Sequence, residues 1–239
     1  MNDICSRVET IQKRIEEAAK RGGRDPEEIS LVAAVKGVDS DQVKGALTCG
    51  ISVLGENRVQ EAERRRRELG QTSPSVLLQW HMIGHLQRNK VKRAVEIFDM
   101  IQSVDTLPLA REVSQRALSR GRRMDVLVEV NTSGEETKFG IPPDLESVEN
   151  FVERIGDLKG IRFLGLMTLG PYFENSEDAR PAFRRLRFLK EQLQKKGYMV
   201  PLLSMGMTHD FEVAIEEGST MVRIGTGLFG KRNHKITRD

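Results

Sequence analysis

A lysine stands at the end of an apolar run near the N-terminus, and it is the first residue of the chain that could do chemistry. The run "LVAAVK" covers residues 31–36, and the "DS" at 39–40 is typical of a helix start. An amine at the mouth of an apolar cavity loses hydration, which favours the uncharged form that makes a Schiff base with a carbonyl. The alternative is that Lys36 extends into solvent or pairs with a carboxylate.

Two loops with glycine and hydroxyl side chains lie near the C-terminus, "SMGMTHDF" at 204–211 and "RIGTGLFG" at 223–230. Backbone N–H groups can approach an anion at the glycines, and Ser204, Thr208 and Thr226 add hydroxyl donors. Both loops could also be ordinary connections in which Thr208 caps a helix. A Schiff-base lysine together with a phosphate site indicates a phosphorylated carbonyl compound, either pyridoxal phosphate or a sugar phosphate as in an aldolase.

Eight short apolar runs, each followed by a polar turn and a helical pattern, must position these residues. Nearly continuous apolar runs are typical of parallel strands covered by helices, and their alternation with helices predicts βαβ units. Eight such units fit a closed (β/α)8 TIM barrel. The alternative is a doubly wound open sheet, but "VKGVDS" lacks the Gly-rich turn that usually follows its first strand. The expected strands are residues 30–36, 52–57, 78–84, 99–104, 125–133, 161–170, 201–206 and 220–226.

The first helix is predicted to complete the ring of helices around this barrel. Apolar residues recur at helical spacing over about residues 3–20, whereas only "GLFGKRNHKITRD" remains after the last strand. That remainder is too short for a full helix and a tail. Because the chain shows no long linker and no internal repeat, we expect a single domain over residues 1–239, with a tail from about residue 231.

The charge balance argues against a dedicated nucleic-acid-binding protein. The 239 residues carry 38 Lys and Arg against 35 Asp and Glu, a net charge of +3. The run "ERRRRE" at 63–68 is interpreted as a solvated helix face, with RNA contact as the alternative. The four histidines have no ligand spacing with cysteines or carboxylates, so no metal is expected.

The cysteines and the N-terminus point to the cytoplasm. Cys5 and Cys49 lie in helix-like patterns without metal-ligand spacing, and they are interpreted as reduced thiols. Residues 1–20 are charged throughout, unlike a secretory signal. No apolar run approaches the roughly 20 residues that span a bilayer, so no membrane contact is expected.

Eight motifs carry a family resemblance over about residues 4–231. They are "AVK" (34–36), "GENRVQEA" (55–62), "WHMIGHLQRNK" (80–90), "SVDT" (103–106), "VNTSGEETKFG" (130–140), "GLMTLGP" (165–171), "LSMGMTHDFEVAIEEGST" (203–220) and "VRIGTGLFG" (222–230). Together they resemble the pyridoxal phosphate homeostasis proteins, whose barrel is similar to the N-terminal domain of alanine racemase. The resemblance implies a barrel of that type which binds pyridoxal 5'-phosphate (PLP).

The resemblance also implies roles for individual residues. Lys36 would hold the cofactor as a Schiff base, and Arg223 would face its pyridine nitrogen. Asn57 and His81 would line the pocket. The two C-terminal loops would bind the phosphate through hydroxyl and backbone groups of Ser204, Met205, Gly206, Thr208, Gly225 and Thr226. These positions suit a (β/α)8 barrel, in which functional groups lie at the C-terminal ends of the strands and in the loops that follow.

A cofactor carrier is favoured over an enzyme. A cation beside the pyridine nitrogen keeps that nitrogen unprotonated and makes the ring a weaker electron sink. Alanine racemase adds a tyrosine base from another domain, whereas this chain has only Tyr172 and Tyr198, and Tyr198 precedes the seventh strand. We therefore expect a cytoplasmic, monomeric protein of PLP homeostasis that buffers PLP or delivers it to apo-enzymes, without established catalysis. The alternatives are a weak PLP-dependent amino-acid racemase and, from another class, a nucleic-acid-binding barrel.

Overall fold

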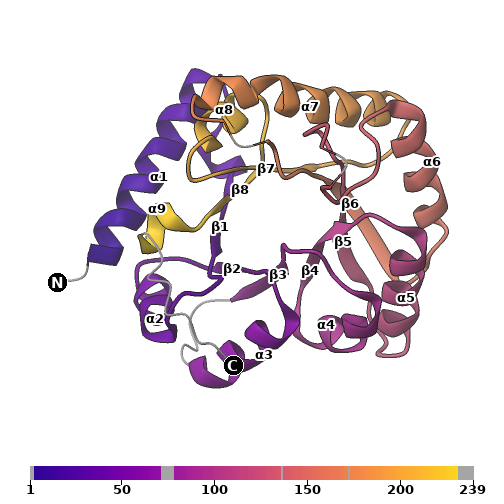
Figure 1. The fold of residues 1–239 in the computed structure, drawn as a ribbon, viewed down its shortest axis with the longest axis horizontal. Coiled ribbons are helices and arrows are strands. Elements are labelled where there is room, and N and C mark those ends of the chain that lie inside the picture. The colour runs from indigo at the N-terminus through magenta and orange to yellow at the C-terminus, as the bar shows by residue number, and fades with distance from the viewer. Residues whose placement is uncertain (1–2, 71–77, 136, 172, 231–239) are drawn as a thin grey trace.

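The chain forms a closed barrel of parallel strands surrounded by helices (Figure 1). The computed structural model describes residues 3–70, 78–135, 137–171 and 173–230. Within these residues each strand pairs with its neighbours in chain order, and the last strand pairs with the first. The predicted (β/α)8 barrel is therefore confirmed, and each strand overlaps a predicted run. The strands are β1 (Ser30–Ala34), β2 (Val53–Glu56), β3 (Gln79–Met82), β4 (Met100–Val104), β5 (Met124–Glu129), β6 (Ile161–Met167), β7 (Leu202–Met207) and β8 (Met221–Ile224).

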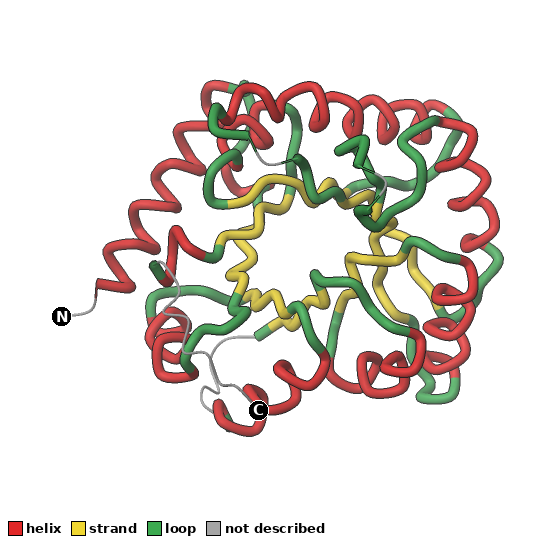
Figure 2. Tube along the Cα trace, viewed as in Figure 1, coloured by secondary structure: helices red, strands yellow, loops and turns green. Residues whose placement is uncertain are grey.

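Helices follow the strands and form an outer layer around the barrel (Figure 2). Side-chain caps set several helix starts: the Asp39 carboxylate accepts a hydrogen bond from the N–H of Asp41, and Asp144 accepts one from the N–H of Ser147. The described α-helices are α1 (Asp3–Arg21), α2 (Ser40–Thr48), α3 (Val59–Leu69), α4 (Val91–Ile97), α5 (Leu107–Leu118), α6 (Leu145–Gly156), α7 (Arg180–Lys195), α8 (Phe211–Glu216) and α9 (Thr226–Phe229). Short 3-10 helices are η1 (Pro26–Glu28), η2 (Arg88–Lys90) and η3 (Ser176–Ala179).

The barrel interior and a larger outer core are separate, because successive side chains of a strand point to opposite faces. On β1, Val32 and Ala34 belong to the interior, whereas Ala33 and Val35 belong to the outer core beneath the helices. This alternation decides which side chains point into the barrel. The buried apolar residues of the interior are Val32, Val53, Ile83, Met100, Leu127, Met167 and Met221.

Helix α1 occupies the last place in the helical ring, as predicted. Strand β8 is followed within the described residues only by the short α9, and α1 packs against α8, α9 and α2 (Figure 1). Val8, Ile11 and Ile15 of α1 are buried in the outer core. Arg14 Nη2 of α1 pairs with Glu212 Oε2 of α8 at 2.9 Å. The first helix therefore stands between α8 and α2 in the outer layer of helices.

Cys5 of α1 and Cys49 at the end of α2 form a disulfide, so the prediction of two reduced thiols is wrong. Their Cα atoms lie 5.2 Å apart although 44 positions separate them in the chain. The physical reason is the ring position of α1, which places it directly beside α2. The disulfide covalently links α1 to the end of α2.

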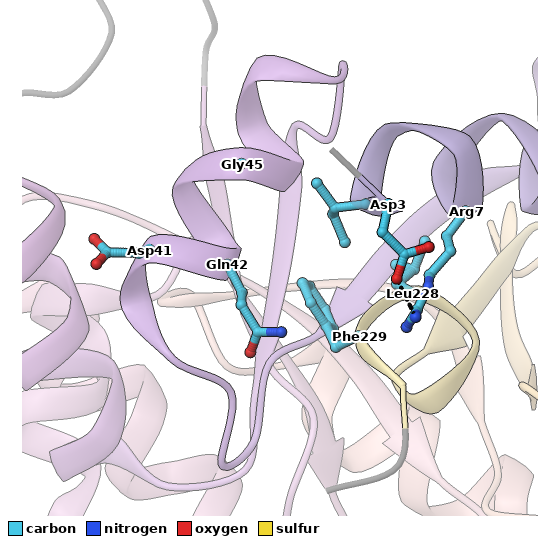
Figure 3. A pocket seen from close by; sticks show the side chains of 8 residues that line it. Asp3, Arg7, Asp41, Gln42, Gly45, Leu228 and Phe229 are labelled. Carbon is cyan, nitrogen blue, oxygen red and sulfur yellow. Dashed lines mark hydrogen bonds and ion pairs between the residues drawn. The ribbon is translucent and has the colours of Figure 1, made fainter. Parts of the chain in front are cut away.

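A surface pocket of about 360 Å³ lies between α1, α2 and α9 (Figure 3). Leu228 and Phe229 of α9 form part of its wall, and Asp41 contributes from α2. Asp3 also lines it and pairs with Arg7 one turn further along α1. None of the residues predicted to bind a cofactor lines this pocket.

Three expectations concern the tail, the tyrosines and membranes. The tail predicted from about residue 231 lies outside the described residues, and so does Tyr172. Tyr198 lies between α7 and β7, at the end of the barrel where the strands begin, as predicted. Over the described ranges no helix combines the length and the apolar character that a membrane span needs.

Candidate functional site

Lys36 lies just beyond β1, at the end of the barrel where all the strands finish. Val32 and Ala34 belong to the interior, so the alternation of the strand places Lys36 on the same side. Val35 still belongs to the sheet, because its N–H donates to Gly55 O at 3.0 Å. Lys36 itself is exposed. The lysine is thus an accessible amine at the mouth of the barrel.

Arg65 of α3 fixes the backbone next to Lys36. Its Nη2 donates to Val35 O at 2.9 Å, and its Nε donates to Glu56 Oε1 at 2.7 Å. The side chains of Arg65 and Glu56 are 1% and 0% exposed. Burial raises the pKa of Glu56, and the Arg65 guanidinium opposes this rise. The interpretation of "ERRRRE" as a solvated helix face is therefore wrong for Arg65, which is buried between α3 and the ends of β1 and β2.

Arg223 of β8 is a buried cation inside the barrel. It is 3% exposed, and its guanidinium donates to Ser204 Oγ on β7 and, at 2.7 Å, to Thr168 O beyond β6. Burial lowers the pKa of Arg223 to about 10, while the charges of Glu129 and Asp210 oppose this shift. The guanidinium is still positive at neutral pH, because this pKa lies well above 7. The side chain therefore extends from β8 toward β6 and places a positive charge inside the barrel.

Buried hydrogen bonds connect Arg223 to His81. Ser204 Oγ accepts from Arg223 and donates to Gln102 Oε1 at 2.6 Å. Gln102 Nε2 lies 3.0 Å from His81 Nδ1, and since an amide nitrogen only donates, Nδ1 accepts. Burial lowers the pKa of His81 to about 4, so the ring is neutral at pH 7. In this structure Ser204 supports Arg223 inside the barrel, and its contact with a phosphate stays a prediction.

The loops after β7 and β8 meet at the mouth. Thr208 Oγ1 accepts a hydrogen bond from the N–H of Gly227 at 3.1 Å, which joins the two loops. Gly225 is the N-cap residue of α9, and Thr226 is exposed in its first turn. Gly206 has a φ of +94°, and a Cβ there would lie 2.6 Å from a side chain of α8, so only glycine allows this packing. The structure thus brings the loops that carry Thr208, Gly225 and Thr226 together at the mouth, and their contact with a phosphate stays a prediction.

Of two other residues predicted to bind the cofactor, Met205 can do so only through its backbone, whereas Asn57 lies on the interior side of the barrel. The Met205 side chain is fully buried in the outer core, so only its backbone can face a ligand. Asn57 follows β2 and is partly buried. Val53 belongs to the interior, and the alternation along β2 therefore places Asn57 on the interior side as well. Asn57 also packs against the loop after β3, because a Cβ on Gly84 would lie 2.6 Å from Asn57 O.

The ends of β4 and β5, across the barrel from β8 and β1, are acidic. Asp105 and Glu129 directly follow Val104 and Val128, which are paired residues of the two strands, so the two carboxyl groups are neighbours. Burial raises the pKa of Glu129 to about 7. The charge of Asp105 adds to the rise, and the charge of Arg223 opposes it. This side of the mouth therefore differs chemically from the side that bears Lys36.

Sequence reasoning missed four buried polar residues at this end of the barrel, namely Arg65, Gln102, Asp105 and Glu129. A signal exists for two of them. Gln102 interrupts the apolar run "DMIQSV", and Glu129 interrupts "DVLVEV". A polar residue in a buried strand requires partners, and these residues could therefore have been selected as site candidates.

The arrangement has a clear chemical character. An accessible amine, a buried guanidinium and two hydroxyl-bearing loops lie at the same end of the barrel. Positive charge and hydroxyl or backbone donors suit an anionic ligand, and the amine can bond to a carbonyl carbon. The mouth is therefore suited to a small, anionic carbonyl compound.

Three comparisons find relatives over nearly the whole chain. Residues 7–233 match the family model described as alanine racemase, N-terminal domain. A pyridoxal phosphate homeostasis protein of Aquifex aeolicus is 45% identical over 233 residues, which are 97% of this chain and 100% of that protein. Another from Escherichia coli K12 is 35% identical over 98% of this chain and 99% of that protein. The structure of PipY from Synechococcus elongatus with PLP bound has a TM-score of 0.82 at 29% identity, covering 95% of this chain and 100% of that one. The chain therefore belongs to the family of pyridoxal phosphate homeostasis proteins.

Proposed function

We propose that this chain binds PLP at the barrel mouth, with Lys36 as the residue of covalent attachment, and that it acts in PLP homeostasis. The observation that carries the proposal is the joint presence of the exposed Lys36 and the buried Arg223 at one end of the barrel. Family membership supports it, and the related PipY has been crystallised with PLP bound.

The residues of the mouth fit the chemistry of this cofactor. PLP carries a phosphate, an aldehyde and a pyridine nitrogen. Thr208, Gly225 and Thr226 would hold the phosphate through hydroxyl and backbone donors, because a hydrogen bond keeps their two loops together. Arg223 would face the pyridine nitrogen, and Lys36 would bond to the aldehyde carbon.

The same residues favour holding the cofactor over catalysis. When bound, PLP supplies an electron sink whose strength depends on a proton at the pyridine nitrogen. Arg223 is positively charged and held by Ser204 and Thr168, so it disfavours that proton. His81 has a pKa of about 4, so at neutral pH its ring is uncharged and is not a general acid. We infer that the chain buffers PLP or delivers it. A cytoplasmic location, a monomeric state and a single domain remain parts of this proposal that rest on the sequence, and the disulfide removes the cysteine argument for the cytoplasm.

The test is the absorbance spectrum of the purified protein with added PLP, before and after borohydride treatment. We expect a visible band that borohydride converts into a stable adduct, located on Lys36 by peptide mass spectrometry. Lys36→Ala is expected to lose the band and the adduct. Lys44→Ala is the matched control, because Lys44 lies on α2 and pairs with Asp41. A wild type that stays colourless with excess PLP would refute the proposal.

The racemase alternative and the delivery role need separate measurements. Long incubation with L-amino acids and chiral analysis of the products would reveal turnover. Sustained D-amino-acid formation that Lys36→Ala abolishes would favour the enzyme. If the chain delivers PLP, the PLP-loaded protein should activate an apo-enzyme faster than it releases PLP into solution. Light scattering would determine whether the chain is a monomer.

A further inference from the structure

Asp105 and Glu129 form a pair of carboxyl groups that the proposed cofactor site does not use. Val104 and Val128 are paired across β4 and β5 and both point into the outer core. The next residue on each strand therefore points to the interior side, which places Asp105 and Glu129 together at the mouth. Both are buried, with exposures of 9% and 3%.

Each carboxyl group has a fully buried oxygen without a partner among the described residues. Among the described residues, no hydrogen bond reaches Asp105 Oδ1 or Glu129 Oε2, and both atoms are buried. The other oxygen of Asp105 lies 3.8 Å from His85 Nδ1. Arg223 is the nearby cation, but its guanidinium donates to Ser204 and to the Thr168 carbonyl instead. Two buried acceptors in the same mouth thus lack donors.

Unpaired buried carboxyl oxygens are unfavourable, and a ligand that supplies donors would remove this cost. PLP does not balance these carboxyl groups, because it is itself an anion and the pyridine nitrogen, its one cationic donor, would face Arg223. A primary ammonium group carries a positive charge and three N–H donors, enough to reach both oxygens. The raised pKa of Glu129 agrees with a carboxyl group that lacks its cation in the free protein.

We propose that Asp105 and Glu129 form a subsite that binds the primary ammonium group of a small ligand. The proposal rests on the proposed function, because the subsite lies in the mouth that would hold PLP. The ammonium group has two chemical sources: the aminated form of the cofactor itself, or a separate small amine such as an amino acid held beside the cofactor. In either case the subsite lets a PLP-holding protein respond to amines.

The loop after β5 borders this subsite. Val130 and Ile141 form an isolated bridge that closes the loop at its base. Phe139 on this loop is 53% exposed and stacks on His85, with 3.7 Å between the ring centroids. Burial raises the pKa of Asp105, and the backbone of Gly140 opposes this rise. The outer flank of Asp105 is therefore covered by the loop and by His85.

The experiment uses two ligand pairs that differ only in an ammonium group against a hydroxyl group. The first pair is pyridoxamine phosphate and pyridoxine phosphate, titrated calorimetrically into apo-protein. The second pair is L-alaninamide and L-lactamide, titrated into PLP-loaded, borohydride-reduced protein. We expect the ammonium member of at least one pair to bind about tenfold or more tightly than its hydroxyl partner. The pair that shows the preference identifies the source of the amine.

Glu129→Gln and Asp105→Asn keep the shape of each side chain and remove its charge. Each is expected to abolish most of the preference while changing the affinity for the hydroxyl ligand less than about threefold. The proposal is overturned if neither pair shows a preference, or if the preference survives in both variants. If one variant fails to fold, the other variant and the wild-type ligand pairs still decide. Failure of PLP to bind wild type would refute the proposed function instead, and both pairs can then be tested on the apo-protein.

Discussion

Replacing Arg65 by alanine is expected to lower the free energy of unfolding by about 4 kcal/mol, because the change breaks a buried ion pair and a buried hydrogen bond together. Arg65 Nε lies 2.7 Å from Glu56 Oε1, and Nη2 donates to Val35 O at 2.9 Å. Removing one partner of a buried ion pair costs about 3–5 kcal/mol, and an unsatisfied buried carbonyl adds about 1–3 kcal/mol. Protonation of Glu56 in the variant offsets part of the sum.

Urea denaturation followed by circular dichroism measures this loss. Arg64→Ala is the matched control from the same arginine run, because the Arg64 side chain is 61% exposed and pairs with Glu68 only at 3.5 Å. That variant is expected to stay within about 1 kcal/mol of wild type. The destabilisation of Arg65→Ala should be smaller at pH 5 than at pH 8, because acid neutralises the unpaired Glu56. Equal stabilities of the two variants would refute the assignment of Arg65 as a buried anchor.

Three further predictions concern stability. The Glu129 pKa of about 7 means that the folded state binds an extra proton, so wild type loses stability as pH rises from 4.5 to 7. Between pH 4 and pH 8 the free energy of unfolding of wild type should fall by about 3 kcal/mol more than that of Glu129→Gln. Parallel plots of unfolding free energy against pH for the two proteins would contradict this. The Cys5–Cys49 disulfide joins residues 44 positions apart, and its reduction should lower the free energy of unfolding by about 4 kcal/mol. An unchanged thermal midpoint in protein whose two thiols are both titratable would disprove this. Gly165→Ala should destabilise by about 3 kcal/mol or more, because its Cβ would lie 2.0 Å from a β7 carbonyl. Gly156→Ala, with nothing within 4 Å, should be neutral or stabilising; similar midpoints for the two alanine variants would count against the reasoning.

The barrel was predictable because its signals are local and repeated. Each apolar run marks a strand, and alternation along a strand then decides which side chain points inward. Lys36 and the loops after β7 and β8 therefore reach the mouth as predicted from strand ends alone. The same alternation could also have selected Gln102 and Glu129, each a polar residue inside a buried run.

The partners of these residues were not predictable, because they depend on which strands face each other across the barrel. Gln102 on β4 contacts Ser204 on β7 and His81 on β3, and no spacing in the sequence encodes that meeting. The disulfide is an intermediate case. Once α1 is placed between α8 and α2 in the ring of helices, Cys5 must lie close to Cys49. The sequence pattern alone suggested two independent thiols.

The ring position of α1 has a consequence for the order in which the barrel can assemble. Helix α1 and strand β1 are synthesised long before their partners α8 and β8, as the contact between Arg14 and Glu212 across 198 positions illustrates. Contacts of such sequence separation are slow to form, because the chain must close a long loop before they stabilise anything. The apolar stripe of Val8, Ile11 and Ile15 therefore lacks its cover from α8 until that helix has been synthesised. The barrel can close only after β8 has been synthesised, and until then α1 is an amphipathic helix without α8 as its packing partner.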